Sequence, residues 1–165
     1  MPVLLLLLAG TATGDNTERF TVAGLEQPAE IIVDEWGVPH IYAGTHYDAF
    51  FAQGFNAARD RLWQIDVWRR RGLGRLSAVF GRITWTRIAL PACSSIGGDM
   101  FREWLAYGSD AKRIAESFTA GINAYIDLLD EHPDLLPPEF ELLDYRPERL
   151  AARRRRPHPW SRSLG

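Results

Sequence analysis

The spacing of apolar residues along the chain predicts two amphipathic helices. The first follows Thr45-His46-Tyr47-Asp48, a capping box in which Asp stands in place of Glu. Apolar residues then recur at spacings of three and four, which places on one helix face Phe51, Phe55, Ala58, Leu62 and Ile65. The second helix ends at His132-Pro133, and its apolar face consists of Ile114, Phe118, Ile122, Tyr125 and Leu129.

A β pattern interrupted by turn residues precedes the first helix, over residues 20–33. The run that ends it, Glu30 to Val33, is followed by the turn signal Asp34-Glu35-Trp36-Gly37 and by a second short strand over residues 38–43. The two strands are predicted to form a hairpin. Pro39 has no N–H to donate, so we expect it at the start or the edge of its strand.

The elements together predict an α+β fold, a β-hairpin followed by helices. Gly72 and Gly74 end the first helix, and residues 76–80 are predicted as a short helix that Gly81 ends. A further helix is expected after Asp99, and Pro137-Pro138 is expected to open a loop. Because two strands do not make a stable sheet alone, the hairpin needs more sheet from elsewhere. The apolar helix faces also need a partner surface.

The amino terminus carries a continuous apolar run from Val3 to Ala9, followed by small residues. This pattern is typical of the apolar core and cleavage zone of a secretory leader, although no basic residue precedes it. We therefore predict that residues 1–14 are a clipped signal segment, with an ordinary apolar segment as the alternative. The run is far too short to span a bilayer.

Composition narrows the function classes. The chain has 165 residues, of which 46% are hydrophobic, so a globular domain or part of one is expected. The lone Cys93 excludes an intrachain disulfide and a CxxC zinc site. Residues 149–165 contain six Arg and no acidic residue, whereas the rest of the chain is acidic. An acidic body does not suggest a nucleic-acid surface, so no nucleic-acid partner is expected.

Residues 31–81 contain several unusual strings in a fixed order. They are Asp34-Glu35-Trp36-Gly37-Val38-Pro39-His40-Ile41-Tyr42-Ala43, then Asp60-Arg61-Leu62-Trp63-Gln64-Ile65, then Arg69-Arg70 and Gly72-Leu73-Gly74-Arg75-Leu76. In order and spacing this segment resembles the start of the α subunit of the penicillin acylase family. The signature residues, to which we assign structural roles, are Asp34, Gly37, Pro39, His40, Asp60, Arg61, Gln64 and Gly74.

The resemblance implies a reaction class and a fold. Members of the family are N-terminal nucleophile hydrolases, whose precursor cuts itself into α and β chains. The new N-terminal Ser of the β chain attacks an amide carbonyl, and its own α-amino group acts as the base. Typical substrates are side-chain amides of β-lactams or N-acyl-homoserine lactones. On this basis the chain is expected to be an incomplete piece of an αββα sandwich, with the β chain as its partner.

The residues that carry out catalysis in the family are expected outside this chain. None of its Asn residues follows a Ser, so the Ser-Asn pair that opens the β chain is absent. The resemblance places the acyl-pocket residues and the calcium ligand of the α chain beyond Leu150. No catalytic residue, substrate residue or metal ligand is therefore assigned, and no cofactor is expected in this chain.

The resemblance also divides the chain. Residues 15–149 correspond to the N-terminal region of the α subunit, and residues 150–165 form a basic tail. The family usually has Trp, Pro and an acidic residue where the tail begins. One back-translation of residues 150–160, shifted by one base, gives Trp-Pro-Pro-Asp. We therefore hypothesise that the tail is frameshifted.

Several side chains admit a functional and a structural interpretation. His40 could be a catalytic base, but its place on a hairpin strand favours a structural histidine. His46 lacks a partner at metal-ligand spacing. The charged residues of the first helix could form a functional cluster, although ion pairs are favoured. They are Asp60, Arg61, Asp66, Arg69 and Arg70.

Three functions remain open from the sequence. The first is an N-terminal fragment of an amide hydrolase that is inactive alone. The second is a gene remnant or a binding subunit with an apolar groove, and the least favoured is a small enzyme that uses Cys93 or His40. Whether the chain is itself an enzyme stays open. A periplasmic or secreted location is expected from the leader, with a cytoplasmic one as the alternative.

Overall fold

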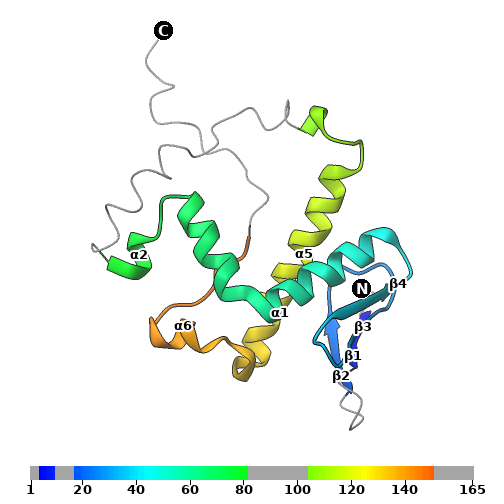
Figure 1. Ribbon diagram of the computed structural model, residues 1–165, viewed down its shortest axis with the longest axis horizontal. Helices are drawn as coiled ribbons and strands as arrows, with labels where there is room; N and C mark the ends of the chain where they lie inside the picture. Colours follow the sequence, from blue (N-terminus) through cyan, green and yellow to red (C-terminus); the bar gives the residue numbers. More distant parts are fainter. Residues whose placement is uncertain (1–3, 10–16, 82–103, 151–165) are drawn as a thin grey trace.

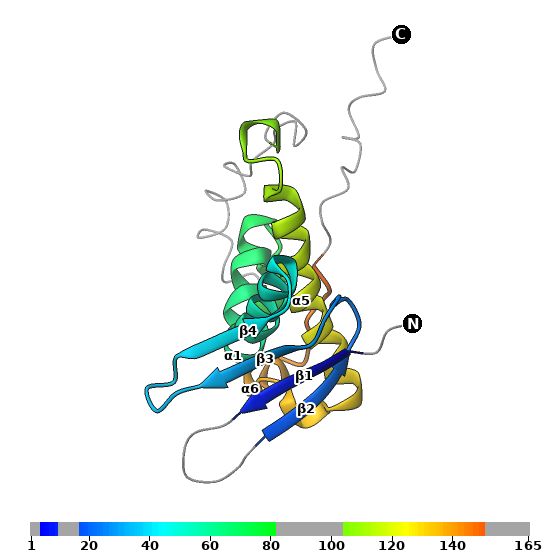
Figure 2. The ribbon, with the colours of Figure 1, turned by 90° about the vertical axis from the view of Figure 1, so that its right-hand side faces the viewer.

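The computed structural model describes residues 4–9, 17–81 and 104–150, with side chains from residue 18 onward, and shows a mixed α+β fold. The described strands form one sheet, and the long helices lie against one of its faces (Figure 2). The elements are β1 (Leu4–Ala9), β2 (Thr17–Val22), β3 (Ala29–Val33), β4 (Pro39–Ala43), α1 (His46–Gly72), α2 (Ser77–Phe80), α5 (Ala111–Glu131), η2 (Pro133–Leu135) and α6 (Pro138–Leu142).

The predicted hairpin is confirmed. Strands β3 and β4 pair antiparallel, with Ile31 opposite Ile41. Pro39 is the first residue of β4, which is an edge strand of the sheet, as its missing N–H predicts. The turn between the strands closes through Gly37, whose φ of 77° lies in the region that favours glycine.

The described sheet has four strands in the order β2-β1-β3-β4, so strands β1 and β2 of the chain itself extend the predicted hairpin. Strand β1 pairs antiparallel with β2 and parallel with β3. Its residues, Leu4–Ala9, belong to the segment predicted as a leader, and that prediction itself stays open. The leucine run lacks the alternation of a half-buried strand, which is why its sequence does not suggest one.

Helix α1 follows the predicted pattern closely. The Thr45 hydroxyl accepts a hydrogen bond from the backbone N–H of Asp48 at 3.1 Å, and the helix extends from His46 to Gly72. Of the predicted apolar face, Phe51, Phe55, Ala58 and Leu62 are buried. The sequence does not reveal that the helix bends at Arg61, where φ is −142° and ψ is 22°. The bend is visible midway along α1 in Figure 1.

Helices α1 and α5 provide the partner surface that their apolar faces require. They cross at two glycines, Gly54 and Gly121, where a Cβ on either would lie 2.0 Å from a backbone oxygen of the other helix. From the predicted face of α5, Ile122, Tyr125 and Leu129 are buried. The partner surface that these two faces need is therefore supplied within the chain.

The carboxyl-terminal part of the described chain packs on the second half of α1. Phe140 of α6 is fully buried and meets the Trp63 ring edge-on at 5.5 Å. The segment expected to be a loop after Pro137 thus contains the short helix α6. Pro138 fits there because the first turn of a helix needs no N–H from it. The short helix predicted before Gly81 is confirmed as α2.

Candidate functional site

The turn between β3 and β4 is organised by one carboxylate. Asp34 Oδ1 accepts hydrogen bonds from the backbone N–H of Trp36 at 2.9 Å and of Val38 at 2.8 Å. Its Oδ2 lies 3.0 Å from Nε2 of His40, which donates from the neighbouring strand. Four signature residues, Asp34, Gly37, Pro39 and His40, therefore lie together in a single hairpin.

The Asp34–His40 pair is open to solvent, with 50% of the His40 side chain and 32% of the Asp34 side chain exposed. The hydrogen bond from His40 is the largest cause that lowers the pKa of Asp34, and the N–H groups of Val38 and Trp36 lower it further. A catalytic histidine would need a nucleophile on its other side. The contact described for His40 serves the turn, which supports its structural interpretation.

The second group of signature residues lies on the outer face of α1. Asp60, Arg61 and Gln64 are all exposed. Asp60 accepts hydrogen bonds from Nδ2 of Asn56 at 3.1 Å and from Nε of Arg59 at 2.9 Å. Gly74 follows the helix with a φ of 67°, which lets the chain turn sharply after α1. The structure does not bring these residues together with Asp34 and His40.

A polar network with a buried centre, Asp66 and Arg70, lies at the end of α1. We use this name for Asp66, Arg69, Arg70, Tyr145 and Glu148. Asp66 is 2% exposed and accepts from Nε of Arg70 at 2.6 Å and from Nη2 of Arg69 at 2.8 Å. The Tyr145 hydroxyl donates to the same carboxylate at 3.1 Å, and the guanidinium of Arg70 lies 4.9 Å from the centre of the Tyr145 ring.

Two members of the polar network, Arg70 and Tyr145, have raised pKa values. Burial alone would lower the pKa of Arg70, but the hydrogen bond and charge of Asp66, with Glu148, outweigh it and raise the pKa. Burial and the neighbouring Asp66 also raise the pKa of Tyr145. Both groups keep their protons at neutral pH, so neither can serve as a base. The predicted ion pairs of α1 are confirmed at Asp66, Arg69 and Arg70.

A second buried carboxylate joins α1 to the sheet. Asp48 accepts from the Thr45 hydroxyl at 2.7 Å, and also from the backbone N–H groups of Glu26 at 2.7 Å and Gln27 at 3.1 Å. It therefore fixes the loop that enters β3. The capping box predicts the contact with Thr45, but its pattern carries no signal for the loop.

Residues 145–150, which follow α6, are held to both long helices. We call this segment the strap. Asn123 of α5 donates from Nδ2 to the carbonyl of Leu150 at 2.8 Å and accepts from its N–H at 2.7 Å. Arg149 pairs with Asp127, also on α5. These contacts link positions 22 and 27 residues apart, so no local motif in the sequence predicts them.

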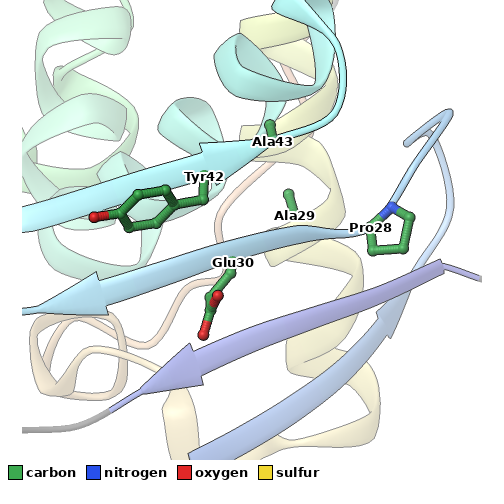
Figure 3. Close-up of a pocket in the computed structure, with 5 residues that line it drawn as sticks. All are labelled: Pro28, Ala29, Glu30, Tyr42 and Ala43. Carbon is green, nitrogen blue, oxygen red and sulfur yellow. The ribbon is translucent and has the colours of Figure 1, made fainter.

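The sheet carries an open hollow of about 360 Å³ where β3 and β4 run side by side. Figure 3 shows the residues that line it, which are Pro28, Ala29, Glu30, Tyr42 and Ala43. The side chain of Tyr42 is prominent there and is 58% exposed. The hollow is too open to enclose a small molecule, since ligand sites bury most of their ligand.

Within the described part of the chain, no three His, Cys, Asp or Glu side chains are grouped so that they could hold a metal ion. None of the described helices is long and apolar enough to cross a membrane. Cys93 and Asp99, after which a further helix is expected, lie outside the described residues. What the described geometry shows is a set of carboxylates and guanidiniums that fasten turns, loops and helix ends.

Comparison with known proteins identifies relatives. Residues 28–162 match the penicillin amidase family. The chain is 35% identical over 128 residues to the penicillin acylase 2 proenzyme of Pseudomonas sp. (strain SE83) and 31% identical over 122 residues to penicillin G acylase of Escherichia coli. It is also 31% identical over 136 residues to the acyl-homoserine lactone acylase QuiP of Pseudomonas aeruginosa.

The alignments cover much of this chain and little of the relatives. They span 78%, 73% and 77% of this chain but only 16%, 14% and 15% of those three proteins. A solved structure, the thermostable penicillin G acylase from Alcaligenes faecalis, aligns with a TM-score of 0.66 and 31% identity. That alignment covers 74% of this chain and 65% of the matched chain.

Proposed function

The chain belongs to the penicillin amidase family, and from this premise we propose that it is the amino-terminal scaffold of a penicillin acylase-type amide hydrolase, inactive on its own. The single observation that carries the proposal is how the described carboxylates are used. Asp34 closes a turn, Asp48 anchors a loop, and Asp66 holds the end of α1 to the strap. Each of these carboxylates supports the framework, and none is paired with a nucleophile.

The chemistry of the complete enzyme would come from a complementary part. By family, an N-terminal Ser of the β chain attacks the carbonyl carbon of an amide, and its own amine takes the hydroxyl proton. Backbone N–H groups stabilise the oxyanion that forms. In this proposal the described sheet and helices are one piece of an αββα sandwich. Its second half comes from the rest of the α chain and from the β chain.

The substrates proposed for the complete enzyme follow from the names of the relatives. Two are penicillin acylases and one is an acyl-homoserine lactone acylase. Both kinds of reaction hydrolyse an amide that joins an acyl group to a polar ring system. We place the enzyme in the periplasm or outside the cell, following the leader-like amino terminus. A calcium site, where present, would use residues beyond the strap.

The proposal is tested by complementation. The 165-residue chain would be assayed on a phenylacetyl amide and on an N-acyl-homoserine lactone, alone and co-produced with Escherichia coli penicillin G acylase that lacks the segment matched by residues 28–150. We expect no turnover by the chain alone and hydrolysis when both parts are present. The shortened acylase without the chain is the control.

Two results would contradict the proposal. Hydrolysis by the chain alone, abolished by His40→Ala, would make it an enzyme in its own right. Failure of the two parts to associate, with the chain folded, would favour the other candidate, a gene remnant or a binding subunit. Binding of the acyl substrate by the chain alone, without hydrolysis, would distinguish the binding subunit.

A further inference from the structure

Three guanidinium groups converge on one carboxylate at the end of α1. We call Arg69, Arg70 and Arg75 the guanidinium cluster. The Oε2 atom of Glu148 lies 3.4 Å from Nη2 of Arg69 and 3.9 Å from Nη1 of Arg75, and its Oε1 atom lies 3.6 Å from Nη2 of Arg70. Hydrogen bonds between a guanidinium and a carboxylate are usually about 2.7–2.9 Å long, so all three contacts are loose. The Glu148 side chain is also 53% exposed, so another anion can compete for its place.

The carboxylates around the guanidinium cluster do not balance its charge. Asp66 accepts from Arg69 and Arg70 at 2.8 and 2.6 Å. In the described part of the chain, Asp66 and Glu148 are the two carboxylates that pair with these three guanidiniums. Among the same residues, Nε of Arg69 is buried and has no hydrogen-bond partner. The cluster therefore keeps a net positive charge and an unused donor.

The guanidinium cluster is better suited to bind an anion than separate surface arginines are. The Arg70 side chain is 7% exposed and its Nε is held by Asp66, so this guanidinium loses little freedom when it binds a ligand. Attraction between charges is also stronger in a partly buried site than in bulk water. The carboxyl end of a helix carries a partial negative charge, so the attraction comes from the side chains and not from α1 itself.

The number of donors indicates the class of anion. A carboxylate has two oxygens, so Arg69 and Arg75 share Oε2 of Glu148. A phosphate group has enough oxygens for each guanidinium to bind one of its own. Pairs of Arg with phosphate are among the strong hydrogen bonds of proteins and are frequently bidentate.

We propose that the guanidinium cluster is a binding site for a phosphate group and that Glu148 is its internal competitor. This site goes beyond the proposed function, since neither amide hydrolysis nor the β chain enters the argument. When phosphate binds, Glu148 moves toward solvent and the anion takes over its contacts. The strap stays attached to the long helices through Tyr145 and Asn123.

Isothermal titration calorimetry of the 165-residue chain with inorganic phosphate tests the site. Sodium chloride at the same ionic strength separates binding from the screening of charge. We expect saturable binding of a single phosphate per chain. We also expect a melting temperature that rises with phosphate concentration, because a ligand of the folded state stabilises that state. Sodium chloride should give neither effect.

Three variants locate the site. Arg75→Gln removes an exposed member of the cluster and should weaken phosphate binding by about fivefold, the largest factor that an exposed ion pair usually contributes. Glu148→Gln removes the competitor and should strengthen binding by about the same factor. Arg146→Gln is the matched control, because Arg146 lies in the strap and is 62% exposed but pairs with Asp130. We expect it to bind phosphate as the unmodified chain does. Circular dichroism verifies that the variants fold.

Two further anions define the ligand. Acetate has two oxygens and should bind more weakly than inorganic phosphate. Tighter binding of β-glycerophosphate than of inorganic phosphate would show that the site takes a phosphate group on an organic molecule. Weaker binding of β-glycerophosphate would identify free phosphate as the ligand.

Several results would overturn the site. They are binding that sodium chloride reproduces, acetate that binds as tightly as phosphate, equal phosphate binding by Arg75→Gln and Arg146→Gln, and no phosphate binding even in Glu148→Gln. Unchanged binding in Glu148→Gln would overturn the role of Glu148 as competitor. None of these measurements depends on hydrolysis of an amide, so their failure and the failure of the proposed function are distinguishable.

Discussion

At the scale of single residues, Asp34 and His40 show that residues of the family signature can have a structural role. The Asp34 carboxylate closes the hairpin turn through two backbone N–H groups, and His40 supplies its third hydrogen bond. Because the pair is exposed, we expect it to tune the turn rather than to determine whether the chain folds.

The first prediction concerns this pair. His40→Ala should raise the pKa of Asp34 toward its ordinary value of 3.8, since the hydrogen bond from His40 is the largest cause that lowers it. Because the pKa of Asp34 is lower in the folded chain than in the unfolded chain, Asp34 stabilises the fold at pH values above its pKa in the unfolded chain. This contribution is lost as the pH falls through its pKa in the folded chain. In His40→Ala this contribution should therefore be smaller, and its loss should be complete at a higher pH. An NMR titration of the Asp34 carboxyl measures the shift, and an unchanged pKa would contradict the prediction.

The second prediction concerns the polar network. Asp66→Asn removes the charge that pairs with Arg70, which is 6% exposed. An unpaired buried charge costs about 3–5 kcal/mol. Because Arg70 keeps Glu148 at 3.6 Å, we expect the free energy of unfolding to fall by an amount near or below the lower end of that range. Urea denaturation measures it.

Asp127→Asn is the matched control for the polar network. It breaks the exposed pair with Arg149, whose two side chains are 63% and 49% exposed. Exposed pairs contribute about 0–1 kcal/mol. Equal losses in Asp66→Asn and Asp127→Asn would show that burial of the network contributes nothing.

The sequence predicts some of these residues and not others. The ion pairs of Asp66 with Arg69 and Arg70 follow from helical spacing, because both partners lie within one turn. Tyr145 is 79 positions from Asp66, and Asn123 is 27 from Leu150. Such contacts depend on how α1, α5 and the strap cross in space, and single-sequence patterns carry no signal for that.

At the scale of elements, the crossing of α1 and α5 depends on the absence of side chains at two positions. A Cβ at Gly54 would lie 2.0 Å from the carbonyl oxygen of Phe118, and one at Gly121 would lie 2.0 Å from that of Phe51. Both obstacles are backbone atoms, which cannot rotate away. The helices would have to separate to accept even a methyl group.

The third prediction follows from this crossing. Gly121→Ala should destabilise the chain by roughly 1–3 kcal/mol or more, as overpacking does, although Ala has the higher helix propensity. Gly72→Ala is the control, because nothing lies within 4 Å of a Cβ at that position. It should be neutral or stabilise by up to about 1 kcal/mol. Thermal unfolding of both variants compares them, and equal shifts would contradict the tight crossing.

Element types were more predictable than their arrangement. The period of apolar residues predicts α1 and α5, and the turn residues predict the β3–β4 hairpin, because local spacing and turn chemistry determine each of them. The bend at Arg61 and the parallel pairing of β1 with β3 depend on packing between distant segments. Neither leaves a periodic trace in the sequence.

At the scale of the whole molecule, helices cover one face of the described sheet, and the first strand of the chain, β1, is an inner strand of that sheet. Strand β1 lies between β2 and β3 and pairs with both. The same residues resemble a leader that secretion would remove. The two interpretations lead to different mature chains. In one, β1 stays in the sheet between β2 and β3; in the other, β1 is removed, and β2 and β3 each have an unpaired edge.

The last prediction distinguishes these chains. A variant that starts at residue 15 lacks β1, so β2 and β3 both lose a neighbouring strand. Unpaired edges promote association between chains. We therefore expect the shortened chain to self-associate at concentrations where the full chain does not, as measured by light scattering after size exclusion. Removal of residues 151–165 leaves all four strands in place and is the control. If both shortened chains behave like the full one, β1 contributes nothing to the sheet, and residues 1–14 are better explained as a leader alone.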